Sequence, residues 1–376
     1  MMNEVFITRT AASLPLEPVG NERMEAVLGC IAGKPSRARR LVLRSNGIQS
    51  RHYALDPLTG EPVMSNAQLA AEAIRALGAT GYIDCLAAAT SSADQLLPGH
   101  GVMVHGELGW PQLEVVSLAG VCLAGTAALR YAAMAVACGA ERAVASASEL
   151  VSPVLHARNF EPESEARLAK LEQHPEIAFE KDFLRWMLSD GAGALLLEQR
   201  PGQGVSLKVL WIELFSNAHR HPACMYAGAE KMDDGSLRGW KRFGPEERMQ
   251  RSLFAVQQDV RLLNEHVAPV TILDPVRVLR ERRGLRAEQI DWFLPHISSM
   301  YFAPILERTL DEARLPIPRD RWFTNLVTCG NTGSASPYIM LDGLLREAPL
   351  QSGQHILMYV PESGRFSSGF VLLEVV

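Results

Sequence analysis

Three residues of types that together carry out acyl-transfer chemistry follow strand-like segments of this chain: Cys122, His296 and Asn331. Cys122 lies within Leu113–Gly139, where a short apolar strand pattern passes through small residues into an Ala-rich segment. Ala and Leu favour a helix, and Gly139 suits the position just past a helix end. A thiol at the start of that helix faces free backbone N–H groups and the positive end of the helix dipole, which favour the thiolate. Cys122 is therefore a candidate nucleophile, and a small buried core residue is the alternative.

His296 and Asn331 also each follow an apolar strand pattern and precede a helical one. In α/β proteins, sites form at that edge of a sheet. A cysteine nucleophile needs a base or hydrogen-bond partner, for which His is the usual residue, and an Asn amide can donate to an oxyanion. Taken singly, His296 could be a loop histidine and Asn331 could serve a turn. The conjunction of the three residues predicts an active site.

The elements that must position these residues alternate between strand and helix in both halves of the chain. This rhythm predicts an α/β fold with sheets covered on both faces. Pro201–Gly204 marks a boundary, so we expect halves 1–200 and 201–376, with a helical insertion at about 151–185 in the first half. The similar order of elements in the two halves suggests duplication. In the second half we predict helices over Pro245–Glu265, Val276–Gly284, Tyr301–Ala313 and Pro337–Glu347, and strands over Ile290–Leu294, Trp322–Val327 and His355–Tyr359.

Composition excludes several other classes of protein. The 376 residues are 47% hydrophobic and 21% charged, with a net charge of -5, which is typical of a globular protein and gives no reason to expect nucleic-acid binding. No apolar run approaches the roughly 18 residues needed to cross a bilayer. The first residues lack the pattern of a signal peptide. Six cysteines without C-x-x-C pairs argue against a zinc site or a disulfide scaffold and fit a reducing cytoplasm.

Several segments, in order, resemble the thiolase superfamily, and most closely the ketoacyl-acyl-carrier-protein synthase III group. The resemblance spans nearly the whole chain and is carried by SNGIQSRH, ATSSADQLLPG, SLAGVCLAGTAAL, LSDGAGALLLE, FLPHISSMYF, CGNTGSAS and ESGRFSSGFVLLEV.

The resemblance implies a five-layered αβαβα fold of two similar halves, usually a homodimer, that needs no metal or redox cofactor. It implies that Cys122 attacks an acyl thioester of coenzyme A or acyl carrier protein. The acyl-enzyme then condenses with a second thioester, typically a malonyl unit that loses its carboxylate. His296 and Asn331 would stabilise the enolate, and the backbone N–H groups of Cys122 and Gly364 would form the other oxyanion hole.

Five residues near these segments bear on the substrate. In the segment after the catalytic His, Ser299 stands where the family has Asn, and Tyr301 stands where it has Arg. Arg365 replaces a Gly of the C-terminal loop and could contact substrate or point to solvent. Leu97 stands where the family often has a Phe that reaches into the partner subunit's pocket, so a longer or bulkier acyl group is expected. Glu149 is a possible second acid or base, although an ion pair with an arginine is the favoured alternative.

These departures favour a specialised ketosynthase over a housekeeping initiator of fatty-acid synthesis. The residues after His296 resemble those of ketosynthases that build dialkylcyclohexanedione and dialkylresorcinol scaffolds by joining a β-ketoacyl thioester to a second acyl thioester. Quinolone-type synthases and acyltransferases of the same fold remain open. A papain-like hydrolase shares the order Cys, His, Asn but has different flanking residues. A non-catalytic partner subunit usually lacks one of the three residues, and all three are present here.

Overall fold

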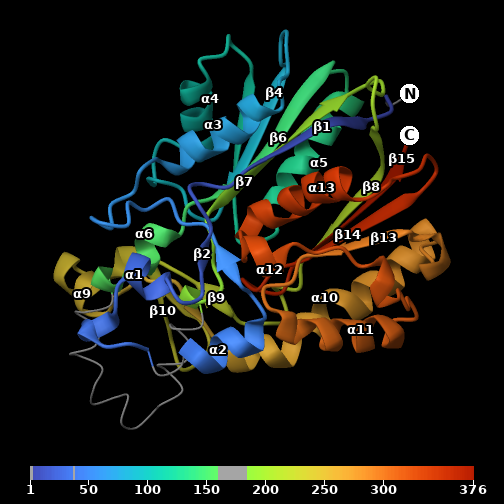
Figure 1. Ribbon diagram of the computed structural model, residues 1–376. Coiled ribbons are helices and arrows are strands. Elements are labelled where there is room, and N and C mark those ends of the chain that lie inside the picture. Colours follow the sequence, from blue (N-terminus) through green and yellow to red (C-terminus); the bar gives the residue numbers. More distant parts are fainter. Residues whose placement is uncertain (1–2, 37–38, 160–183) are drawn as a thin grey trace.

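The computed structural model describes residues 3–36, 39–159 and 184–376. Strands and helices alternate through both halves of the chain (Figure 1). The principal elements of the first half are β1 (Phe6–Ser13), α3 (Asn66–Ala76), β4 (Cys85–Thr90), α4 (His100–Leu108), β5 (Glu114–Ala119), α5 (Ala124–Ala137), β6 (Arg142–Glu149) and β7 (Gly191–Glu198). Those of the second half are β8 (Leu207–Phe215), α10 (Val260–Arg283), β13 (Trp292–Pro295), α11 (Ala303–Glu312), α12 (Leu326–Cys329), α13 (Ser336–Glu347), β14 (His355–Pro361) and β15 (Ser368–Val375).

Nine strands form one sheet in the order β13-β14-β15-β8-β1-β7-β6-β4-β5. The parallel and antiparallel pairings follow the same pattern on the two sides of the sheet. On one side β4 is parallel to β6, which is antiparallel to β7, which is antiparallel to β1. On the other side β13, β14, β15 and β8 repeat that pattern. Only two residue pairs, Phe6–Lys208 and Ile7–Leu207, join β1 to β8. The sheet therefore consists of two similarly built parts joined by a short seam.

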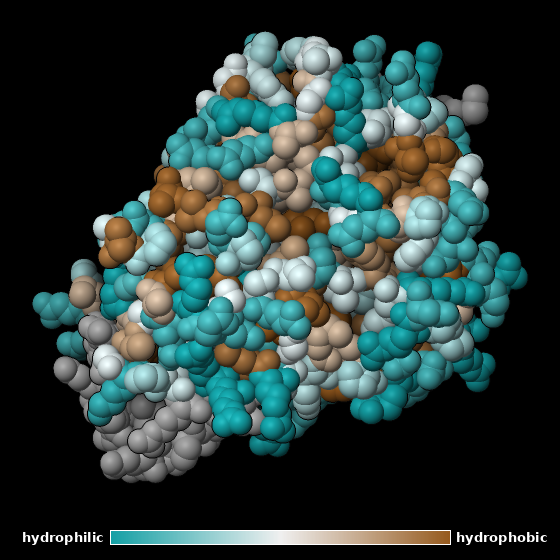
Figure 2. Space-filling model, viewed as in Figure 1, coloured by the Kyte–Doolittle hydropathy of each residue, from teal (hydrophilic) through white to brown (hydrophobic). Residues whose placement is uncertain are grey.

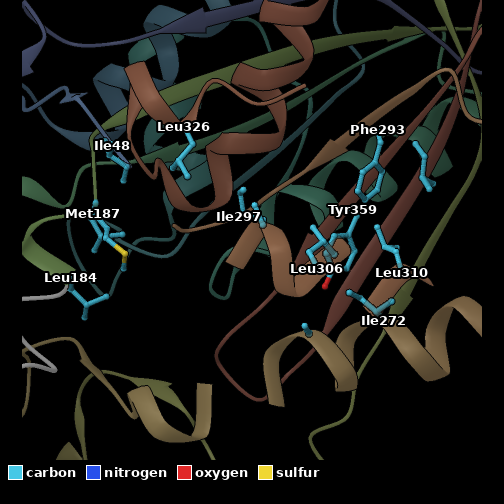
Figure 3. Close-up of a cluster of buried hydrophobic side chains, with 14 of the residues drawn as sticks. Ile48, Leu184, Met187, Ile272, Phe293, Ile297, Leu306, Leu310, Leu326 and Tyr359 are labelled. Carbon is cyan, nitrogen blue, oxygen red and sulfur yellow. The ribbon is translucent and has the colours of Figure 1, made fainter. Parts of the chain in front are cut away.

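Three buried apolar cores separate five layers. One core lies between α3 and the first part of the sheet, and another lies between α10, α11 and the second part (Figure 3). The middle core joins α5 and α13 to strands of both parts. On β4, Leu86 and Ala88 face α3 whereas Ala87 and Ala89 face α5, so both faces of this strand are buried. This layering confirms the expected α/β, thiolase-like αβαβα fold.

Three predictions for the second half are wrong. The helix expected over Pro245–Glu265 is interrupted: α9 (Pro245–Gln250) ends, β12 (Gln257–Gln258) follows, and the side chain of Asp259 caps α10 by accepting a hydrogen bond from Leu262 N. Helix α10 then continues through two internal prolines to Arg283, so Val276–Gly284 is not a separate helix. The strand expected over Trp322–Val327 is a single bridge, between Trp322 and Phe293, followed by α12.

Short elements complete the fold around the cavities and the surface. They are β2 (Val19–Gly20), α1 (Met24–Leu28), α2 (Arg39–Asn46), β3 (Ser50–Arg51), α6 (Ser152–Leu155), β9 (Met225–Tyr226), β10 (Ala229–Lys231) and β11 (Leu237–Gly239). Of the insertion expected at about 151–185, residues 160–183 lie outside the described residues. None of the described helices is long and apolar enough to span a membrane. On the face shown in Figure 2, hydrophobic residues form separate patches between hydrophilic ones.

Candidate functional site

Two cavities meet at Cys122. The larger has a volume of about 290 Å³ and the smaller about 50 Å³. Cys122, Ser298 and Ser363 line both cavities, whereas His296 lines the smaller and Asn331 the larger. The fold thus brings together three predicted residues that are far apart in sequence. The larger cavity is mainly apolar, with walls that include Val121, Val151, Val154, Leu184, Met187, Leu188, Met225 and Val256.

Cys122 lies in the turn between β5 and α5, two residues before the helix begins. Ala124 N donates to Val121 O at 3.1 Å and closes this turn. The expectation of a ready thiolate is not supported, because loss of hydration raises the pKa of the Cys122 thiol, and the charges of Glu362 and Glu149 raise this pKa further. The thiol is therefore protonated at neutral pH and must lose its proton when it attacks.

His296 follows β13 directly and is almost fully buried. Its backbone N–H donates to Tyr359 O at 2.8 Å, which fixes the turn beside β14. Burial lowers the pKa of His296 to about 4. The imidazole is therefore neutral at pH 7 and carries one N–H donor and one acceptor. A neutral donor at this point can hydrogen-bond a thioester oxygen without adding a buried charge.

Asn331 is held by its own backbone on both sides. Its N–H donates to Met187 O, and its C=O accepts from Ser189 N, both at 2.9 Å. The side-chain oxygen accepts from Gly333 N at 3.0 Å. Because the oxygen is engaged, the amide NH₂ is the part of the side chain left to donate to a ligand in the larger cavity.

Glu149 lines the larger cavity and is 1% exposed. Its carboxylate accepts hydrogen bonds from Ser91 N and Oγ, from Ser92 Oγ, and from Ser334 N and Oγ, at 2.5 to 3.2 Å. The ion pair with an arginine that the sequence favoured is therefore wrong: serine hydroxyls and backbone N–H groups satisfy this acid. These hydrogen bonds connect Glu149, at the end of β6, to Ser334 in the turn that carries Asn331, so Glu149 positions that turn.

Three further predicted residues do not line either cavity in this chain. Leu97 is 85% exposed on the loop before α4. Arg365 is exposed, and its Nε and Nη2 donate to His221 O at 3.0 and 2.8 Å, so its guanidinium binds the backbone of a neighbouring loop. Gly364 is buried next to Val121, and its carbonyl accepts from Cys224 N at 2.8 Å. The role of the Gly364 N–H in an oxyanion hole stays a prediction.

Ser299 and Tyr301 do not face the cavities either. Ser299 is fully buried, and its hydroxyl caps a short helical turn by accepting from Tyr301 N at 3.2 Å. Tyr301 is 47% exposed and packs edge-on against Phe302. The neighbouring Ser298, which the sequence did not single out, lines both cavities. The predicted contact with the substrate was placed at Ser299, one residue after Ser298, which lines the cavities. The chain turns just after β13, and this turn buries Ser299 away from the cavities.

Sequence reasoning missed a second carboxylate, Glu362. It follows β14 at the same sheet edge as the other site residues, and its charge acts on Cys122 more strongly than that of Glu149. Its position directly after an apolar strand was the available signal. Among the described residues, no group of three or more His, Cys, Asp or Glu side chains could hold a metal ion. The expectation of no cofactor stays a prediction.

Comparison with known proteins finds a family profile and a curated relative that carry the same description. The profile of the family described as 3-oxoacyl-(acyl-carrier-protein) synthase III, C terminal, matches residues 280–373. The chain is 25% identical over 370 residues to the beta-ketoacyl-(acyl-carrier-protein) synthase III of Chelativorans sp. (strain BNC1), with 96% of each chain covered.

Solved structures with the same fold include a condensing enzyme and the protein OleA. The tetronic acid condensing enzyme AbyA1 superimposes with a TM-score of 0.73 and 20% identity, covering 98% of this chain and 99% of that one. OleA of Xanthomonas campestris, solved as a Cys-to-Ser variant with bound lauric acid and lauroyl-CoA, superimposes with a TM-score of 0.72 and 18% identity over the full length of both chains.

Proposed function

We propose that the chain is a ketosynthase of the ketoacyl-acyl-carrier-protein synthase III-like group of the thiolase superfamily, with Cys122 as the acyl carrier. The observation that carries the proposal is the meeting of two cavities at Cys122, with His296 on one and Asn331 on the other. A thiol, a neutral imidazole and a free amide donor around one space fit acyl transfer followed by enolate chemistry.

Acylation comes first. The Cys122 sulfur attacks the carbonyl carbon of an acyl thioester, a C–S bond to the enzyme forms, and the carrier's C–S bond breaks. The carrier thiol leaves with the proton that Cys122 gives up. Because the pKa of Cys122 is raised, the thioester carbonyl must be polarised as the proton moves, and the backbone N–H groups of Cys122 and Gly364 are the proposed donors.

Condensation follows in the same space. A second thioester becomes an enolate, and its α-carbon attacks the carbonyl carbon of the Cys122 acyl group to give a β-ketoacyl product. His296 and Asn331 donate to the enolate oxygen. Removing one such donor typically costs about 10²–10³ in rate. Burial keeps His296 neutral, which suits it to donate to a developing charge rather than to hold a proton.

We propose a specialised role in lipid or polyketide metabolism rather than the start of fatty-acid synthesis. The larger cavity is mainly apolar and has room for an acyl chain. The names of the structural relatives, a tetronic acid condensing enzyme and an OleA with bound lauroyl-CoA, support the same direction. The donors would be thioesters of coenzyme A or acyl carrier protein in the cytoplasm. Ring closure after condensation, as in dialkylresorcinol-type synthases, is compatible with this site.

Intact-protein mass spectrometry tests the acyl carrier directly. Wild-type protein is mixed with acetyl-, octanoyl- and decanoyl-CoA, and we expect an adduct of the acyl mass on Cys122 with at least one medium-chain donor. The Cys122→Ala variant is expected to show no adduct. The Cys138→Ala variant, which removes an exposed cysteine, serves as the matched control and is expected to be acylated normally. Full activity of Cys122→Ala in the presence of a partner synthase would instead favour a non-catalytic subunit.

A further inference from the structure

One buried amide in the larger cavity lacks a hydrogen-bond partner. Four polar side chains that line this cavity are 5% exposed or less: Glu149, Ser189, Asn331 and Gln258. The side chains of the first three make hydrogen bonds within the chain. The Gln258 side chain, in contrast, forms no hydrogen bond with any residue that the structure describes. A buried amide with both its donor and its acceptor free is unusual, because most buried polar groups are paired.

The Gln258 side chain faces the cavity because of its place on a short strand. Gln258 is the second residue of β12 and pairs with Met225 of β9. Val256 and Gln258 both line the cavity, whereas Gln257 between them does not. Alternate side chains of an extended segment point to the same side. The amide of Gln258 therefore points to the space that Val256 and Met225 also border.

Backbone pairing places Gln258 at a distance from the reacting sulfur. Ser363 lines both cavities beside Cys122, and its carbonyl accepts from Met225 N at 3.0 Å. Met225 pairs in turn with Gln258. Hydrogen-bonded extended segments lie about 4.8 Å apart, so the backbone of Gln258 lies about 10 Å from that of Ser363. An acyl group on Cys122 would meet this amide with the outer part of its chain, several carbon atoms from the thioester.

The chemistry of the wall decides which chain fits there. A plain hydrocarbon would cover the Gln258 amide without pairing it, which costs free energy. A hydroxyl on the chain can accept from the amide NH₂ or donate to the amide oxygen, and a keto oxygen can accept from the NH₂. A charged carboxylate is disfavoured, because Glu149 lines the same cavity and no described Lys or Arg does.

We propose that Gln258 is a specificity-determining residue that hydrogen-bonds a neutral oxygen, a hydroxyl or keto group, beyond the β-carbon of the acyl chain carried by Cys122. This inference rests on the proposed ketosynthase function and names its substrate class, an acyl thioester with an oxygen-bearing chain. The contact selects the chain and leaves the reaction at the thioester unchanged.

Acylation kinetics with matched donors test this contact. Wild-type protein is mixed with octanoyl-CoA or with 3-, 6- or 7-hydroxyoctanoyl-CoA, and the rate of adduct formation on Cys122 is followed by intact-protein mass spectrometry. We expect the 6- or the 7-hydroxy donor to react about tenfold faster than octanoyl-CoA or more. Gln258→Met keeps an unbranched side chain but removes the amide, so it should abolish this preference. It should still accept octanoyl-CoA, which shows that the variant folds.

Two control variants separate the amide from the shape of the wall. Gln351→Met, at an exposed glutamine outside both cavities, should keep the wild-type rates and preference. Val256→Ala changes the same wall without changing its polarity, so the rates with plain and hydroxylated donors should change in parallel.

Three results would overturn the inference. The first is equal wild-type rates with octanoyl-CoA and both distal hydroxy donors, as expected if water pairs with the amide. The second is a preference that survives Gln258→Met. The third is a preference for the 3-hydroxy donor alone, which would place recognition beside Cys122. Absence of an adduct on wild-type Cys122 with every donor would instead overturn the ketosynthase function itself.

Discussion

At the scale of single residues, the reactivity of Cys122 is governed by two opposing features of its surroundings. The turn before α5 offers backbone donors to the sulfur, but lost hydration and the charges of Glu362 and Glu149 raise the thiol pKa above its ordinary value. The sequence pattern predicted the first feature, since the small residues and the helix are local. It could not predict the second, because the two carboxylates arrive from β6 and β14, far away in the chain.

The pH dependence of Cys122 alkylation follows from this environment. A raised pKa means that thiolate appears only at higher pH, so the rate of reaction with iodoacetamide should keep rising above pH 9. Glu362→Gln removes one negative charge, which lowers the thiol pKa and should shift the profile to lower pH. Intact-mass kinetics at a series of pH values measures both. A plateau below pH 8 in the wild-type protein, or no shift in the variant, would contradict the assigned electrostatics.

Asp190, in the LSDGAGALLLE segment, stabilises the joint between loops near the site. Its carboxylate accepts from Ala54 N at 2.7 Å, from Val151 N at 2.7 Å, and from Ser152 N at 2.9 Å and its hydroxyl. Asp190→Ala leaves these buried donors unpaired, so we expect the free energy of unfolding to fall by about 3 kcal/mol or more. Asp234→Ala, which removes an exposed acceptor, is the control and should cost less than about 1 kcal/mol. Denaturant unfolding compares the two.

The same carboxyl gives a pH dependence of stability. Burial raises the pKa of Asp190 to about 6, above the value of about 4 expected in the unfolded chain. The folded protein therefore holds this proton more tightly. The resulting stabilisation is full below pH 4 and is lost as the pH rises through 6.

At the scale of elements, the close approach of α5 to the turn that carries Asn331 depends on Gly125. A Cβ at this position would stand 2.2 Å from Ser334 O, and Tyr338 Oη donates to Gly125 O at 2.9 Å. Gly125→Ala should therefore push α5 from this turn, lower stability by about 1–3 kcal/mol and reduce condensation activity. Gly106→Ala on α4, where a Cβ meets nothing within 4 Å, is the matched control. Equal activity of both variants would show that the contact is not needed.

Most of the elements that position the site could be predicted from their sequence patterns, as β5, α5 and β13 show. The errors have physical causes. The N-cap at Asp259 outweighed the helical composition of Pro245–Glu265, and helix α10 tolerates two prolines that usually end a helix.

The Trp322–Val327 error has a different cause. The apolar residues of this segment pack in the core and do not pair as a strand. The centroid of the Trp322 ring, for example, lies 5.3 Å from that of the Phe293 ring in an edge-on contact. Tertiary contacts of this kind are not visible in a local pattern.

At the scale of the whole molecule, β5 is an edge strand that, among the described residues, pairs only with β4, and its side chains are exposed or half-buried. Leu96 and Leu97 are also exposed, at 73% and 85%. An unpaired edge and exposed apolar side chains favour association with a second copy. We propose that the chain forms a homodimer that covers both features.

Light scattering after size exclusion should therefore give twice the chain mass of 41.3 kDa. Leu97→Glu should weaken the dimer, because it places a charge in the contact. Leu58→Glu, at an equally exposed leucine elsewhere in the chain, should not weaken it. A monomeric wild-type protein, or equal effects of the two variants, would contradict the dimer.

The central claim is that Cys122 carries an acyl group into a C–C bond, and a single-turnover chase tests it most directly. Wild-type protein is acylated with ¹³C-labelled octanoyl-CoA, freed of excess donor, and mixed with an unlabelled second thioester. We predict that the adduct mass disappears from Cys122 as a β-ketoacyl thioester containing the labelled acyl group appears, and that His296→Ala slows this step by about 10²–10³ without preventing acylation. Release of the label only as free octanoic acid would contradict the claim.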